Sequence, residues 1–158
     1  MHVRAATDDE VDALARIWHD GWREAHEAIL PAELGRHRTY ESFRHRLRAM
    51  LPTVRAVGPP GSPTGFCVVR DHELYQLYVS AAARGTGAAA ALVADAEARL
   101  HDAGAETGWL ACAIGNERAA RFYEKCGWRR VGNVVEHVPI PDGTLLLEVW
   151  RYEKRLSD

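Results

Sequence analysis

Cysteines are scarce in this sequence, and those present are too scattered for a disulfide framework or a cysteine-based metal site. The 158 residues contain three, Cys67, Cys112 and Cys126, and no two of them form a CxxC pair. The histidines show neither an HExxH motif nor the spacing of a Cys/His metal site. We therefore expect three reduced thiols and no bound metal.

Long apolar runs are also missing. No stretch approaches the ~18–20 apolar residues that cross a bilayer, and no secretory leader pattern opens the chain. Charge of one sign is not in excess either, because 20 Lys and Arg residues face 22 Asp and Glu residues, for a net charge of −2. These absences predict a cytoplasmic protein that binds neither membranes nor nucleic acid.

What is present is typical of one globular domain. Hydrophobic residues make up 47% of the chain and charged residues 27%, and no repeat, low-complexity tract or linker divides it. The length fits a single domain over residues 1–158.

Helical spacing of apolar residues dominates the first third of the chain. Thr7 and Glu10 form a capping-box pattern just before the apolar residues Val11, Leu14 and Ile17. Prolines after two later apolar stretches predict where those helices end. The expected helices are Asp8–His19, Trp22–Leu30 before Pro31, and Tyr40–Leu51 before Pro52.

Strands are expected around two further helices. A glycine- and proline-rich turn, residues 58–63, separates two β-prone runs that we expect to pair as a hairpin. The order of elements predicts a mixed α/β sheet with one βαβ crossover. The expected strands are 2–6, 53–57, 65–70, 73–79, 109–114, 129–138 and 145–152, and the two further helices are 87–103 and 116–126.

The segment after residue 79 combines small residues with an expected helix start. Arg84-Gly85-Thr86-Gly87 follows a strand and opens a helix that begins with four alanines. Backbone N–H groups at a helix start have no partner inside the helix, and together with the helix dipole they bind anions such as pyrophosphate. The stretch is neither a P-loop nor a dinucleotide fingerprint. Taken alone, it is explained at least as well by a tight turn with an efficient helix start.

Two motifs in register give the chain a family resemblance. Arg84-x-x-Gly87-x-Ala89 resembles the Q/R-x-x-G-x-G/A motif of GNAT acetyltransferases, which holds the pyrophosphate of acetyl-CoA. Asn116-x-x-Ala119-x-x-Phe122-Tyr123-Glu124-Lys125-x-Gly127-Trp128 resembles the second cofactor motif of that family. Gly21-Trp22 through Leu30-Pro31 is similar to bacterial small-molecule members. The chain departs from the commonest pattern with Arg for Gln, Ala for Gly and Trp for Phe, none of which puts cofactor binding in doubt.

The resemblance implies a fold, a co-substrate and a set of binding residues. The fold is a mixed, mostly antiparallel sheet of about six to seven strands with a splayed strand pair, flanked by about four to five helices. The co-substrate is acetyl-CoA, with no metal. The cofactor-binding residues carried over are Leu77, Tyr78, Val79, Arg84, Gly85, Thr86, Gly87, Ala88, Ala89, Asn116, Ala119, Phe122 and Tyr123.

Amine acetylation sets three chemical requirements. An amine with a pKa near ~10.4 is mostly protonated at pH 7 and needs a base, the oxyanion needs donors, and the leaving thiolate gains from an acid. The resemblance places Tyr123 as the acid and the backbone N–H of Val79 as the oxyanion donor. Glu73, six residues before Val79, is the first candidate base, with Glu148 and His72 behind it. A core role for Tyr123 and a solvated Glu73 stay open as alternatives.

The acceptor side carries weaker signals. Trp22, Glu24, His26 and Tyr40 are the candidates for lining an acceptor pocket, although amphipathic helices also bury Trp and Tyr in cores. A basic face in the third helical region has two explanations, a solvated surface or attraction for an acidic acceptor or the 3′-phosphate of CoA. Its members are Arg36, Arg38, Arg44, Arg46 and Arg48.

The predicted function is transfer of the acetyl group of acetyl-CoA to a primary amine of a small molecule, by direct attack in a ternary complex. A homodimer is left open. Two alternatives also stay open: a non-catalytic acyl-CoA-binding sensor or scaffold, and an acetyltransferase that modifies a protein N-terminus or lysine. An aminoacyl-tRNA acceptor is disfavoured by the net charge of −2.

Overall fold

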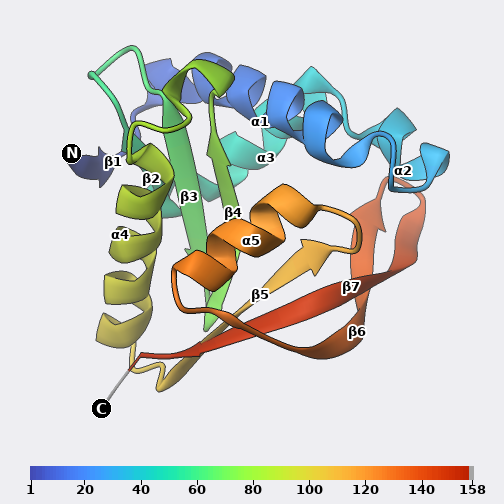
Figure 1. The fold of residues 1–158 in the computed structure, drawn as a ribbon. Coiled ribbons are helices and arrows are strands. Elements are labelled where there is room, and N and C mark those ends of the chain that lie inside the picture. Colours follow the sequence, from blue (N-terminus) through green and yellow to red (C-terminus); the bar gives the residue numbers. More distant parts are fainter. Residues whose placement is uncertain (157–158) are drawn as a thin grey trace.

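The computed structural model describes residues 1–156 and contains a seven-stranded sheet in the order β1-β2-β3-β4-β5-β7-β6 (Figure 1). Neighbouring strands are antiparallel except β4 and β5, which are parallel. The expected mixed, mostly antiparallel sheet is confirmed. The strands are β1 (Val3–Ala5), β2 (Val54–Val57), β3 (Gly65–Arg70), β4 (Glu73–Val79), β5 (Thr107–Ala113), β6 (Arg129–Ile140) and β7 (Gly143–Arg155).

Five α-helices flank this sheet within the described residues. Short 3₁₀ turns lie before the first of them, after the third and before the fourth. The last three helices begin and end within one or two residues of the predicted positions. The helices are α1 (Val11–His26), α2 (Ala32–His37), α3 (Tyr40–Met50), α4 (Ala88–Asp102) and α5 (Glu117–Lys125).

The N-terminal helices differ from the prediction. The helices expected at 8–19 and 22–30 are one continuous helix, α1, and Pro31 precedes α2 instead of ending a helix. Gly21 lies inside α1 because the ring of Tyr78 packs against it: a Cβ at Gly21 would lie 2.7 Å from Cδ1 of Tyr78. Glycine costs about 1 kcal/mol inside a helix, and here it permits that close approach. Proline is tolerated at a helix start because the N–H that it lacks has no helical acceptor there.

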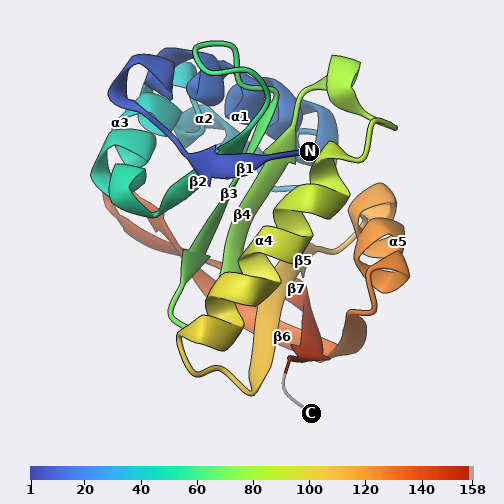
Figure 2. The same cartoon turned by 90° about the vertical axis from the view of Figure 1, so that its left-hand side faces the viewer.

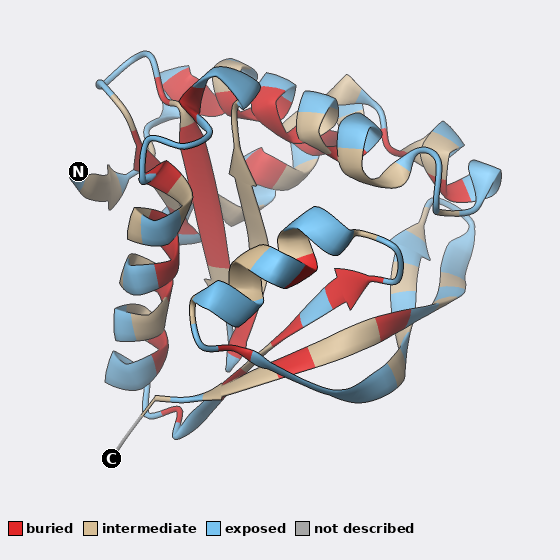
Figure 3. Cartoon of the chain, in the orientation of Figure 1, coloured by how far each residue is buried: buried red, intermediate tan, exposed pale blue. Residues whose placement is uncertain are grey.

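Helices α1–α3 and helices α4–α5 cover opposite faces of the sheet (Figure 2), and each group packs over its own hydrophobic cluster. The α1–α3 cluster includes Trp18, Phe43 and Phe66, and the α4–α5 cluster includes Leu92 and Trp128. Successive residues of a strand face opposite sides of the sheet, so β3 contributes to both clusters. Figure 3 accordingly shows β3 buried along most of its length.

The neighbouring strands β4 and β5 diverge, which opens the sheet at its centre. They pair only at Glu73 and Trp109. The register between β3 and β4 shifts between Val68 and Val69, which leaves Tyr75 of β4 without a partner. Such a bulge bends and twists its strand. The rest of β4 therefore turns away from β5, and the expected splayed strand pair is confirmed.

The hairpin of β6 and β7 is longer than predicted, and its far end lies beside α2 (Figure 1). One hydrogen bond ties the two regions together, because Nη2 of Arg38 donates to the carbonyl oxygen of Pro139 at 3.1 Å. The hairpin thereby closes the side of the molecule next to the diverging strands. No helix within residues 1–156 is long and apolar enough to cross a membrane.

Candidate active site

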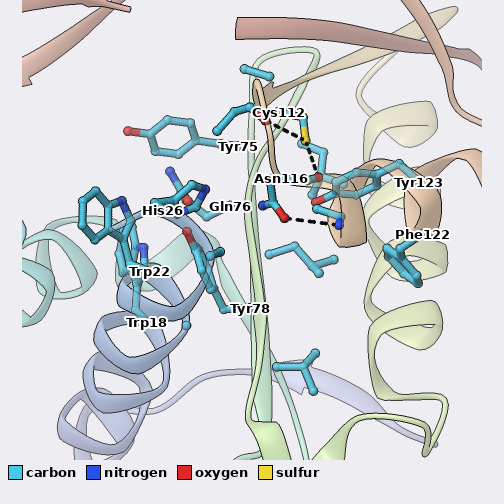
Figure 4. Close-up of a pocket in the computed structure, with 18 of the residues that line it drawn as sticks. Trp18, Trp22, His26, Tyr75, Gln76, Tyr78, Cys112, Asn116, Phe122 and Tyr123 are labelled. Carbon is cyan, nitrogen blue, oxygen red and sulfur yellow. Dashed lines mark hydrogen bonds between the residues drawn. The ribbon is translucent and has the colours of Figure 1, made fainter. Parts of the chain in front are cut away.

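A cavity of about 840 Å³ lies where β4 and β5 diverge. Its walls come from α1, β4, the turn before α4, α5 and the β6–β7 hairpin. Figure 4 shows aromatic side chains of α1 and β4 on one side, and Phe122 and Tyr123 of α5 with its N-cap Asn116 on the other. Of the residues predicted to bind the cofactor, those lining the cavity are Leu77, Tyr78, Val79, Arg84, Gly85, Gly87, Ala88, Ala89, Asn116, Ala119, Phe122 and Tyr123. Thr86 does not line it, and its hydroxyl donates to the carbonyl of Ala83.

The turn before α4 has the shape of an anion site. Gly85 and Gly87 have positive φ values of 77° and 89°, and a Cβ at either glycine would meet nothing within 4 Å. The first helical hydrogen bond of this turn runs from the N–H of Ala91 to the carbonyl of Gly87, at 3.0 Å. The preceding N–H groups have no acceptor within the helix. Small side chains and free N–H groups together fit a pyrophosphate.

The exposed edge of β4 offers further backbone groups. The N–H of Ser80 donates to the carbonyl of Thr64, on the β3 side, at 2.8 Å. Because N–H groups alternate between the two edges of a strand, the N–H of Val79 faces the gap toward β5. The gap therefore contains a backbone donor at the position where the sequence predicts one.

Arg84 forms a bidentate ion pair at the rim of the cavity. Its Nη1 and Nη2 atoms lie 2.8 and 2.7 Å from the carboxylate oxygens of Glu24, and Nη1 of Arg118 lies 3.0 Å from the same carboxylate. Hydrogen bonds from Arg84 and Arg118 lower the pKa of Glu24 to about 2. Glu24, a candidate for the acceptor pocket, thus joins α1 to the glycine turn and to α5, and it does not line the cavity.

Tyr123 extends from α5 toward Asn116 and Cys112 (Figure 4). Burial is the main cause that raises the pKa of its phenol, followed by the neighbouring Cys112 and Tyr78. The hydroxyl therefore keeps its proton at neutral pH. Asn116 caps α5, since its Oδ1 accepts from the N–H of Ala119 at 3.4 Å.

Glu73 is a buried carboxyl group in the wall of the same cavity. It is only 6% exposed, and its Oε1 lies 3.3 Å from Nη2 of Arg70. Burial raises its pKa, and the charge of Arg70 opposes that rise. A carboxyl group with a raised pKa is a stronger base than an exposed one. His72 and Glu148, the two further candidates for the base, are exposed and do not line the cavity.

The predicted acceptor residues divide into two groups. Trp22 and His26 of α1 line the cavity, and burial lowers the pKa of His26 to about 4, so that its ring is neutral at pH 7. Tyr40 does not line it. Its hydroxyl donates to the carbonyl of Asp12 at 3.4 Å, and the guanidinium of Arg16 stacks on its ring at 5.0 Å.

Several lining residues were missed by the sequence analysis. Tyr75 and Gln76 reach the cavity because of the bulge in β4, and Glu136 and His137 because the β6–β7 hairpin folds back toward α2. Two arginines of the predicted basic face, Arg38 and Arg46, also line it. The sequence shows that both are arginines, but nothing in it predicts that these two line a cavity while other arginines of that face are exposed.

Comparison with known proteins shows which family shares this sequence and architecture. The model of the acetyltransferase (GNAT) family matches residues 11–128. An uncharacterised N-acetyltransferase of Mycobacterium tuberculosis is 47% identical over 60 residues, which are 38% of this chain and 38% of that protein. The chain thus matches well under half the length of this curated relative.

Solved structures share the fold over nearly the whole chain. A GCN5-related N-acetyltransferase from Rhodopseudomonas palustris has a TM-score of 0.74 at 19% identity, covering 98% of this chain and 94% of its own. A putative acetyltransferase from Salmonella typhimurium, solved with its cofactor acetyl-CoA, has a TM-score of 0.70 at 14% identity, covering 100% and 95%. With the family model matched over most of its length, this chain belongs to the acetyltransferase (GNAT) family.

Proposed function

We propose that this protein transfers the acetyl group of acetyl-CoA to a primary amine of a small molecule. One observation carries the proposal: the glycine turn before α4, the protonated Tyr123 and the buried Glu73 all line one cavity. An anion site, an acid and a base are the groups that amine acetylation requires. The related Salmonella structure, which contains acetyl-CoA, supports the same co-substrate here.

The residues around the glycine turn fit the cofactor. The N–H groups at the start of α4 are suited to a pyrophosphate, and the free edge of β4 is suited to the amides of a pantetheine arm. Arg84 is paired with the carboxylate of Glu24. We assign Arg84 to the phosphates of the cofactor, for which it would exchange this carboxylate when the cofactor binds. When bound, acetyl-CoA supplies an acetyl group activated as a thioester.

The protein's own residues would divide the proton transfers. Glu73 accepts a proton from the ammonium form of the acceptor, directly or through a water molecule, and so provides the neutral amine. The N–H of Val79 stabilises negative charge that develops on the carbonyl oxygen. Tyr123 holds a proton at Oη and donates it to the departing sulfur. The neutral amine attacks the thioester carbonyl directly, with both substrates in the cavity. The C–N bond forms, the C–S bond breaks, and the extra proton on the nitrogen passes to water.

Acetyl-CoA-dependent release of free thiol tests the proposal. We expect release in the presence of at least one class among polyamines, aminoglycosides, amino acids and lysine peptides, measured with a thiol-reactive dye. CoA should also raise the melting temperature by binding the folded state. CoA binding without thiol release from any class would favour a sensor or scaffold, and release with lysine peptides alone would favour a protein acceptor. Absence of both signals would contradict the proposal.

Glu73→Gln is expected to lower kcat/KM by about 100-fold, because the variant cannot accept a proton. The base must be deprotonated to act, and burial raises its pKa. The acid limb of the wild-type pH profile should therefore lie above the usual range of a glutamate, and the variant should lack it. The profile of kcat/KM against pH measures both effects, with the exposed Glu148→Gln as the matched control. An unchanged acid limb in Glu73→Gln would assign the base to another group.

The same substitution has a predicted effect on stability. A carboxyl group whose pKa is higher in the folded than in the unfolded state binds more protons when folded. Its contribution is thus most favourable below the unfolded pKa and is lost as the pH rises through the folded pKa. Glu73→Gln removes this loss, so at neutral pH we expect its free energy of unfolding, measured in urea, to equal or exceed that of the wild type.

A further inference from the structure

Three charged or polar side chains are buried among the described residues, and one of them has no oppositely charged partner there. Glu10 pairs with Arg4 at 2.7 Å, and Glu73 pairs with Arg70 at 3.3 Å. The side chain of Arg38, a residue that is 8% exposed, makes one hydrogen bond within residues 1–156, to the carbonyl oxygen of Pro139. A buried guanidinium without a counter-charge is costly, and a single carbonyl compensates only part of the lost hydration.

Arg46 is a second cation in the same wall of the cavity. Its Nη2 donates to the hydroxyl of Tyr75 at 2.9 Å, and its guanidinium stacks on the ring of Trp18 at 4.5 Å. Within residues 1–156 it forms no ion pair. Burial and the charge of Arg46 lower the pKa of Arg38 to about 10, which still leaves Arg38 protonated at neutral pH. Two like charges therefore face one cavity.

The other arginines of the predicted basic face behave differently. Arg36 and Arg48 are exposed and do not line the cavity. Arg44 pairs with Asp12 at 2.7 Å and with Glu41 at 3.0 Å. If the basic face served only as a solvated surface, Arg38 and Arg46 would not be expected to line the cavity. The geometry thus divides the basic face into solvated or paired arginines and a cavity-facing pair, Arg38 and Arg46, which we call the arginine pair.

We infer that the acceptor amine also carries a carboxylate or phosphate group, which the arginine pair binds while the amine faces Glu73. This inference rests on the proposed function and names its substrate class. Planar guanidinium groups recognise both kinds of oxyanion through paired N–H donors. The anionic form of Glu73 and the cationic arginine pair line the same cavity, so the cavity complements an acceptor that carries both a positive and a negative group.

Binding of matched acceptors to the CoA-saturated protein tests the inference without requiring turnover. One series consists of ω-amino acids of increasing chain length, each compared with its own amide, and a second pair compares O-phosphoethanolamine with ethanolamine. We expect the best anionic amine to bind at least about tenfold tighter than its neutral analogue in calorimetry. The two series distinguish a carboxylate from a phosphate. With acetyl-CoA, the same preference should appear in kcat/KM.

Substitutions of the arginine pair connect the preference to these residues. In Arg38→Gln and Arg46→Gln, affinity for the anionic amine should fall by about 10- to 100-fold, and affinity for its neutral analogue by less than about threefold. Lysine at either position should recover part of the loss, because it keeps the charge without the planar fork. Arg48→Gln, two residues from Arg46 and outside the cavity, is the matched control and should bind both amines like the wild type.

Three results would overturn the inference. They are equal binding of anionic and neutral amines, an equal loss for both in the Gln variants, and no binding of any anionic amine at millimolar concentration while CoA still binds. The last result would leave the acetyltransferase proposal standing with another acceptor. Failure of CoA itself to bind would instead contradict the proposed function.

Discussion

Tyr123→Phe is expected to lower kcat by about 100- to 1,000-fold, because a general acid contributes on that scale. The substitution removes only the hydroxyl, so the ring keeps its contacts with Phe122 at 5.5 Å and Tyr152 at 6.4 Å between centroids. The Kd of CoA should therefore stay within about threefold of the wild-type value. Steady-state kinetics with acetyl-CoA, together with a CoA titration, measure the two quantities.

Tyr152→Phe is the matched control for this experiment. Tyr152 is as buried as any residue of the core, and its hydroxyl donates to Glu124 at 2.6 Å and accepts from Arg130 at 3.1 Å. It does not line the cavity. Loss of the Tyr152 hydroxyl should lower the free energy of unfolding by about 1 kcal/mol and leave kcat unchanged. If both variants kept the wild-type kcat, Tyr123 would have no part in the chemistry and would serve the core of α5.

Gly87→Ala is expected to weaken CoA binding by about 10- to 100-fold, since a Cβ would lie where we propose that the phosphates approach the backbone. It should also destabilise the fold by about 1–2 kcal/mol, because Gly87 has a φ of 89°. Two effects are thus superimposed, and only one of them concerns the cofactor. Calorimetric titration with CoA and urea unfolding measure them separately.

Gly104→Ala isolates the backbone effect. Gly104 follows the other end of α4 with a φ of 92°, and a Cβ there also meets nothing within 4 Å. The two variants should lose similar stability, and only Gly87→Ala should lose affinity for CoA. Equal CoA affinity in both would show that the phosphates lie away from this turn.

Local patterns predicted most of the fold. β3 and β4 begin and end at the predicted residues, because their turns contain glycine, proline or aspartate and their faces are clearly apolar. The prediction failed at α1, where two helices were expected and one continuous helix runs through Gly21. The reason is non-local: the ring of Tyr78, from the centre of the sheet, needs the space that Gly21 leaves. No window around residue 21 contains that information.

The candidate site shows the same division. The glycine turn and the helix after Asn116 are each one continuous stretch of sequence, so motifs could propose them as cofactor segments, and the structure brings both to one cavity. The acceptor region is assembled from α1, α3, the bulge in β4 and the far end of a hairpin. None of these parts contains a recognisable motif. Only the folded chain brings Arg38 and Arg46 to one cavity and leaves Tyr40 outside it. Burial separated the members of the basic face, and burial depends on the whole chain.

The two hydrophobic clusters have a consequence for how such a protein can change over evolution. The glycine turn and α5 pack with the α4–α5 cluster, while Trp18 and Phe43, on whose rings Arg46 stacks, belong to the α1–α3 cluster. Between β4 and β5, pairing is confined to Glu73 and Trp109. Mutations in the proposed acceptor region therefore fall mainly in a different packing unit from mutations in the proposed cofactor turn. Substrate choice can drift in one half while the other half retains its ligand.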